Sequence, residues 1–140
     1  MAMMLLMGTV LVDGAATGMS LTTDTPLSFW GGVDPHTGCI IDRRHPLFGK
    51  SIAHRILVLP SGRGSCSASG VLLEAIANGT APAGIIVSEV DPIIGLGAIL
   101  GDELLGRTVP VVLLTPDERI AIADCTNVRM LAGGSIELGK

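Results

Sequence analysis

Aromatic side chains are scarce in this sequence: its 140 residues include two Phe, one Trp and no Tyr. Proteins that hold single-stranded nucleic acid stack bases on aromatic rings and neutralise phosphates with Lys and Arg. This chain instead has a net charge of −4. The composition therefore argues against nucleic acid or an anionic membrane as a partner. With 48% hydrophobic residues, it predicts an aliphatic core.

Cysteines and long apolar runs are also few. The chain has three cysteines, Cys39, Cys66 and Cys125, and their spacing is not that of metal ligands. An odd number of cysteines favours a reduced protein over a disulfide framework. The apolar residues 1–12 are too few for a membrane span and lack the basic start of a signal peptide. We interpret them as a first strand and expect a soluble, cytoplasmic protein.

The apolar runs predict a single α/β domain over residues 1–140, without linker or repeat. Strands are expected at residues 5–12, 19–23, 26–30, 55–60, 84–89 and 108–114, with a closing two-strand piece at 127–138. Helices are expected from Ser67 or Ser69 to about Asn78, from Pro92 to about residue 106, and as a short helix at 117–124. The order β-α-β-α-β in the second half favours a compact domain with a barrel-like or mixed sheet flanked by helices.

The segment "PSGRGSCSASG", residues 60–70, joins a strand to a helix with far more polar and small residues than a turn needs. We call it the elbow. Ligands of α/β domains bind beyond the carboxyl ends of strands, where glycine lets backbone N–H groups approach an anion. Arg63 can bind a carboxylate or phosphate through two hydrogen bonds. Hydroxyl or thiol groups are available at Ser65, Cys66 and Ser67. A capped strand-to-helix turn without ligand is the alternative.

Known nucleotide and hydrolase motifs do not account for the elbow. It lacks the Gly-Lys-Ser/Thr ending of a Walker A loop, the GxGxxG dinucleotide fingerprint and the GxSxG nucleophile motif. Cys66 is either a reactive thiol or a small buried residue.

The three histidines, His36, His45 and His54, have no regular ligand spacing. We interpret each as a loop or surface residue rather than a metal ligand.

Two further pairs are candidates for the site. Glu89 and Asp91 follow a strand and could reach a site, although a turn before Pro92 explains Asp91 as well. The neighbours Phe29 and Trp30 either line a site, pack on a partner or pack in the core, and we favour core packing.

The stretch "GGVDPHTGCIIDRRHPLFGKSIAHRILVLPSGRGSCSASGVLLE", within residues 26–112, resembles the aconitase X swivel-domain family. The resemblance implies a swivelling β/β/α domain and a dehydratase of two parts. Because this chain is too short to contain the large part, it resembles the small subunit of a two-chain enzyme. Residues 14–18 depart from the family pattern, because they are less acidic than expected.

The resemblance also implies a division of labour. The large catalytic subunit holds an iron–sulfur cluster on its own cysteines, which binds the leaving hydroxyl as a Lewis acid, and the small subunit binds no cofactor. By its position, Ser65 matches the serine that removes the substrate proton. Arg63, Gly64, Cys66 and Ser67 are then expected to contact a small carboxylate substrate.

Family members act on two substrates. One is cis-3-hydroxy-L-proline, which is dehydrated to 1-pyrroline-2-carboxylate, and the other is mevalonate 5-phosphate. The elbow with Arg63 resembles the first type, since archaeal versions often have lysine there. A phosphomevalonate dehydratase small subunit, or a non-catalytic anion-binding or structural partner of a large subunit, is the alternative.

Overall fold

The computed structural model describes residues 4–64 and 67–139. Its strands are β1 (Met4–Met7), β2 (Thr9–Val12), β3 (Ala16–Thr22), β4 (Ile56–Val58), β5 (Gly84–Val87), β6 (Val111–Leu113), β7 (Asn127–Met130) and β8 (Ser135–Leu138). Its helices are α1 (Ser67–Asn78), α2 (Pro92–Leu105) and α3 (Pro116–Ile120). The predicted order β-α-β-α-β is confirmed as β4-α1-β5-α2-β6.

The strands form one mixed sheet in the order β1-β8-β7-β3-β4-β5-β6-β2. Strand β3 joins its two halves, because Ala16–Met19 pair antiparallel with β7 and Ser20–Thr22 pair parallel with β4. The two end strands of this order, β1 and β2, are consecutive in the chain and flank Gly8. The sheet therefore nearly closes on itself, which confirms the barrel-like prediction.

The prediction of one strand over residues 5–12 is wrong in one respect, because the strand breaks at Gly8. Before Gly8 the segment pairs with β8, and after Gly8 it pairs with β6. At the change of partner, the Gly8 N–H donates to the Gly134 carbonyl at 2.8 Å. A Cβ at Gly8 would clash with the Val112 side chain. Glycine thus lets one extended segment cross from one half of the sheet to the other.

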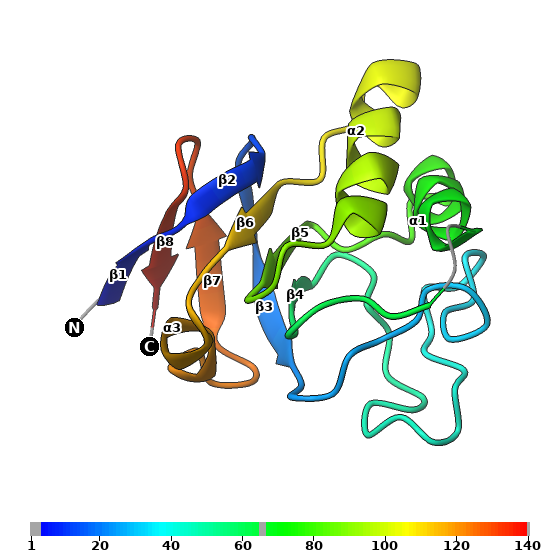
Figure 1. The fold of residues 1–140 in the computed structure, drawn as a ribbon, viewed down its shortest axis with the longest axis horizontal. Helices are drawn as coiled ribbons and strands as arrows, with labels where there is room; N and C mark the ends of the chain where they lie inside the picture. Colours follow the sequence, from blue (N-terminus) through cyan, green and yellow to red (C-terminus); the bar gives the residue numbers. More distant parts are fainter. Residues whose placement is uncertain (1–3, 65–66, 140) are drawn as a thin grey trace.

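Helices α1 and α2 lie side by side on one side of the parallel strands, while both termini lie at the opposite end of the molecule (Figure 1). The close packing favours glycine at position 97, since a Cβ there would lie 3.0 Å from both the Leu72 side chain and the Ser69 carbonyl oxygen. Ser69 is not the helix cap, because α1 begins at Ser67 and the Ser69 hydroxyl donates to the Ile93 carbonyl at 3.0 Å. The end of α1 at Asn78, followed by Gly79 with φ +75°, agrees with the prediction.

Alternating residues of the central strands face two separate cores. Leu57 of β4 packs beneath α1 and α2, whereas Ile56 and Val58 pack inside the barrel-like half. All three side chains are fully buried. Strand β4 is therefore covered on both faces, in keeping with its continuously apolar sequence.

Between β3 and β4, residues 23–55 wrap beside the elbow with isolated bridges instead of regular strands (Figure 1). The strand expected at 26–30 is reduced to a single bridge between Leu27 and Gly62. His45 is a loop residue as predicted, but it is buried, and its ring contacts the Thr25 carbonyl and accepts the Leu47 N–H. His36 and His54 are exposed loop residues.

Candidate functional site at the elbow

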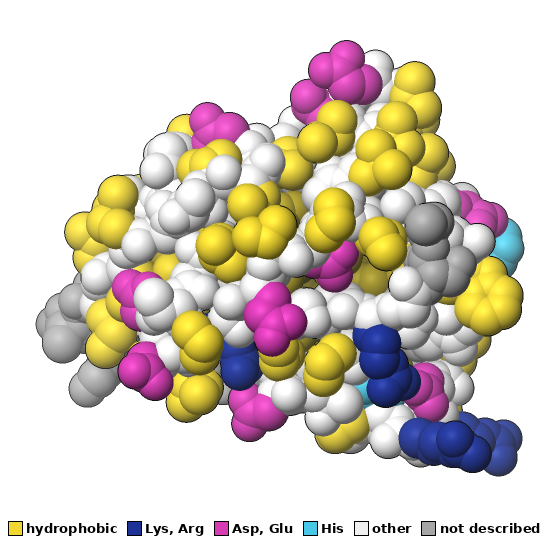
Figure 2. Space-filling model, in the orientation of Figure 1, with side chains coloured by type: hydrophobic (Ala, Val, Ile, Leu, Met, Phe, Trp, Pro, Cys, Tyr) yellow, Lys and Arg dark blue, Asp and Glu magenta, His cyan; other side chains and the backbone are white. Residues whose placement is uncertain are grey.

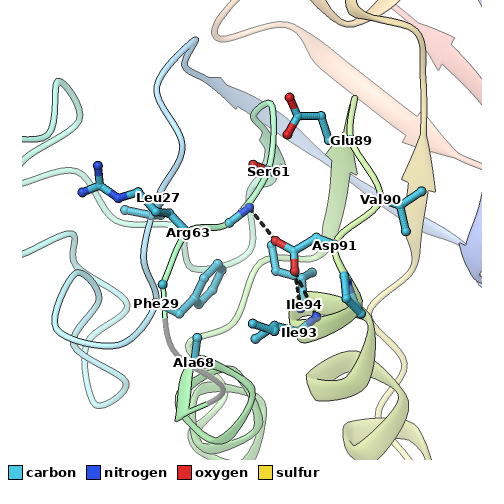
Figure 3. Close-up of a pocket in the computed structure, with 13 residues that line it drawn as sticks. Leu27, Phe29, Ser61, Arg63, Ala68, Glu89, Val90, Asp91, Ile93 and Ile94 are labelled. Carbon is cyan, nitrogen blue, oxygen red and sulfur yellow. Dashed lines mark hydrogen bonds between the residues drawn. The ribbon is translucent and has the colours of Figure 1, made fainter.

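The elbow leaves the carboxyl end of β4 beside the turn that follows β5. The Pro60 carbonyl accepts the N–H groups of Ser88 and Glu89, both at 3.0 Å, so the two strand ends are tied together. Beside them lies a pocket of about 270 Å³. It is lined by Leu27, Phe29, Ser61, Gly62, Arg63, Gly64, Ala68 and residues 89–94 (Figure 3).

The Asp91 carboxylate connects both sides of this pocket. Its Oδ1 accepts the N–H groups of Ile93 and Ile94 at 3.0 and 3.1 Å and thereby caps α2. Its Oδ2 accepts the N–H of Gly62 in the elbow at 2.7 Å (Figure 3). Asp91 therefore caps the helix that begins at Pro92, as expected, and it also lines the pocket.

A second contact holds the elbow from the opposite side. The Arg63 N–H donates to the Leu27 carbonyl at 3.1 Å, and the Leu27 N–H donates to the Ser61 carbonyl at 3.3 Å. The N–H groups of Gly62 and Arg63 thus already have partners. The expectation that elbow N–H groups bind an anion does not hold for these two amides in this structure.

Two elbow glycines are required by geometry rather than by flexibility. A Cβ at Gly62 would lie 2.6 Å from Asp91 Oδ2, and Gly64 has φ +105°, in the region that disfavours other residues. A Cβ at Gly64 would also lie 3.0 Å from the Ser28 hydroxyl.

The predicted site residues are only partly placed by the structure. Ser65 and Cys66 lie outside the described residues, and Ser67 is the first residue of α1. Arg63 and Gly64 are exposed at the pocket. Figure 3 shows the Arg63 guanidinium pointing away from Asp91 and Glu89.

The pocket floor is apolar. Phe29 is 1% exposed and lines the pocket, as does Ala68 at the start of α1. Core packing is thus confirmed for Phe29 but wrong for Trp30, which is 59% exposed. The sequence argument missed the bond from Asp91 to Gly62, because the Asp-Pro pair before a helix signals only the start of that helix.

Within residues 4–64 and 67–139, no group of three or more His, Cys, Asp or Glu side chains could hold a metal ion. Cys39 and Cys125 are free thiols. No helix in the same part of the chain is long and apolar enough to cross a membrane.

Comparison with known families identifies the fold. Residues 5–138 match the family model of the aconitase X swivel domain, and the chain belongs to this family. The structure resembles the crystal structure of Thermococcus kodakaraensis aconitase X in its holo-form, with a TM-score of 0.87 and 36% identity, covering 97% of this chain and 98% of that one. The predicted family and fold class are confirmed.

The curated relatives have two different names. The chain is 48% and 43% identical to the proteins named cis-3-hydroxy-L-proline dehydratase from Pseudomonas aeruginosa and Hypocrea jecorina, over 93% and 94% of its length but 22% of theirs. It is 42% identical to the protein named phosphomevalonate dehydratase small subunit from Methanopyrus kandleri, covering 84% of both chains. The chain therefore spans about a fifth of the first two relatives.

Proposed function

We propose that this chain is the small subunit of a hydro-lyase that dehydrates cis-3-hydroxy-L-proline to 1-pyrroline-2-carboxylate. The observation that carries the proposal is the 48% identity to the Pseudomonas aeruginosa relative of that name, across almost the whole chain. A second candidate function is that of a phosphomevalonate dehydratase small subunit. It is favoured by the 84% coverage of the Methanopyrus kandleri relative, which is a separate small chain.

The proposal includes a separate large subunit and a cytoplasmic complex. We take residues 1–140 as one swivel domain, because the swivel-domain family model matches residues 5–138. The separate large subunit is supported by the name of the Methanopyrus kandleri relative, which is a small subunit. The large subunit is proposed to hold the iron–sulfur cluster, because the described part of this chain offers no ligand set for one. Free thiols at Cys39 and Cys125 suit a reducing compartment.

The surface around the pocket is suited to a partner. Trp30 and Val90 are 59% and 66% exposed, and Val90 lines the pocket directly. Figure 2 shows further hydrophobic side chains gathered over α2, where Leu96 and Ile99 are exposed. Large exposed apolar groups beside a site are typical of surfaces that another protein covers.

In the proposed mechanism, the elbow supplies groups to a site shared by the two subunits. Ser65 removes the substrate proton, and Arg63 binds the substrate carboxylate. Gly64, Cys66 and Ser67 complete the contact with substrate. Helix α1 begins at Ser67, two residues after Ser65 in the sequence, and the positive end of a helix favours an anionic oxygen near it.

The substrate assay tests this proposal. The chain, assembled with the large subunit of the same source, is expected to convert cis-3-hydroxy-L-proline to the pyrroline carboxylate and to leave mevalonate 5-phosphate unchanged. Product formation is followed by mass spectrometry with both substrates at equal concentration. Turnover of mevalonate 5-phosphate alone would establish the second function, and turnover of neither by a fully assembled complex would favour a non-catalytic binding role.

Arg63→Lys is expected to lower kcat/KM about tenfold or more, mainly by raising KM. Lysine keeps the positive charge but loses the planar pair of donors that binds a carboxylate in two places, and a hydrogen bond to a charged group contributes about 1.5–3 kcal/mol. Steady-state kinetics of the complex measure the change. Arg107→Lys, which alters an arginine bonded to carbonyls at the end of α1, is the matched control. Unchanged kinetics in Arg63→Lys would place Arg63 outside the substrate contacts.

A further inference from the structure

The two oxygens of the Asp91 carboxylate have different partners. Oδ1 accepts two N–H groups of its own helix, α2, which is the ordinary task of a capping residue. Oδ2 is not needed for this cap and accepts the Gly62 N–H, 29 residues earlier in the chain, at 2.7 Å. Asp91 is only 9% exposed, so water competes weakly for this bond.

We propose that Asp91 is a positioning residue for the dehydration: through Gly62 it holds the elbow at the distance from α2 that the reaction requires. The inference rests on the proposed function, in which Ser65 of the elbow removes the substrate proton. Ser65 follows Gly62 by three residues. Only Arg63 and Gly64 separate Gly62 from the reacting group in the chain, so the position of Gly62 sets where the backbone enters the reacting segment.

The geometry around Gly62 leaves little room for another arrangement. The position of a Cβ at Gly62 is 2.6 Å from Asp91 Oδ2 and 3.1 Å from Ile94 Cδ1, so the elbow backbone lies directly against the start of α2. On its other side the elbow pairs with Leu27. Two other contacts reach the α2 side from the two ends of the elbow: the Pro60 carbonyl accepts the N–H groups of Ser88 and Glu89, and the Ser69 hydroxyl donates to the Ile93 carbonyl. The Asp91 bond holds the middle of the elbow at Gly62, and Figure 3 shows it crossing the pocket between the two segments.

The substitution Asp91→Asn separates positioning from helix capping. Asparagine caps helices about as well as aspartate, and its single oxygen can retain the bonds to Ile93 and Ile94. Its amide group then faces Gly62 as a donor instead of an acceptor, so the bond to the elbow is lost. The matched control is Asp102→Asn, which makes the same change at the other end of α2. Asp102 is exposed and accepts a hydrogen bond from the Thr108 hydroxyl.

In the assembled complex, Asp91→Asn is expected to lower kcat about 10²-fold, because a misplacement of about 1 Å has an effect of this size. KM, the circular dichroism spectrum and the affinity for the large subunit are expected to stay close to wild type. Substrate deuterated at the carbon that loses its proton should show a larger isotope effect, since proton removal becomes more rate-limiting. Asp102→Asn should keep wild-type kinetics. Gly62→Ala, which displaces the elbow from the same contact, should reproduce the kcat loss.

A purely structural role would give a different pattern. Unchanged kcat in a folded Asp91→Asn complex overturns the inference, and so does a loss that appears only as weaker assembly or a lower melting temperature. Hydrogen exchange of the Gly62 amide in the full chain checks the bond without any activity: protection in wild type and faster exchange in Asp91→Asn are expected, and equal exchange would overturn the inference. An inactive wild-type complex would instead contradict the proposed function itself.

Discussion

Replacing Ser65 by alanine in the assembled complex is expected to lower kcat by about 10³-fold or more, because general-base groups typically contribute 10²- to 10⁴-fold. A serine hydroxyl is an ordinary weak base and acts only where its alkoxide is stabilised. Two features of the sequence around Ser65 favour a stabilised alkoxide: α1 begins at Ser67, two residues after Ser65, and the cation Arg63 stands two residues before it. Steady-state kinetics on cis-3-hydroxy-L-proline measure the loss.

Cys66→Ala and Ser67→Ala are the matched controls, because they alter the neighbouring hydroxyl and thiol on the same segment. Both are expected to change kcat by much less than Ser65→Ala. Assembly of every variant with the large subunit is verified by size-exclusion chromatography before kinetics. Substantial activity in Ser65→Ala, together with its loss in Cys66→Ala or Ser67→Ala, would mean that the base is a different elbow residue.

The purified chain without its large subunit is expected to show no turnover above the uncatalysed rate. Hydroxide is a poor leaving group whose departure a Lewis acid assists, and the described part of the chain offers no set of side chains to hold a metal ion. In the two curated dehydratases that resemble this chain at 48% and 43% identity, about four-fifths of the length lies outside the matched part. Activity is therefore expected only with the large subunit.

Titration of the chain into a constant amount of large subunit provides the measurement. Activity should rise from the background and saturate at an equimolar ratio, with the same product throughout. Heat-denatured small subunit serves as the control for carried-over activity. Full turnover by the small chain alone would contradict the proposed two-chain enzyme.

Local patterns in the sequence were sufficient for the helices and central strands. The segment around Ile56 and Leu57 is continuously apolar, and the structure buries it on both faces. Pro92 and the preceding Asp91 mark the start of α2, while Gly79 marks the end of α1. These signals act within a few residues, through side-chain caps and backbone conformation, and are therefore readable without the fold.

The sequence alone also determined the family, because the elbow and its surroundings form a long specific pattern that the family match over residues 5–138 confirms. The tertiary structure decided three features that no local pattern contains: the break at Gly8 that closes the sheet, the burial of His45 with the exposure of Trp30, and the bond from Asp91 to Gly62. Each depends on which distant segments meet. Gly8 is constrained by Val112, and Gly62 by a carboxylate 29 residues away. Such contacts form only when the whole chain packs, because burial and strand pairing act between neighbours in space rather than in sequence.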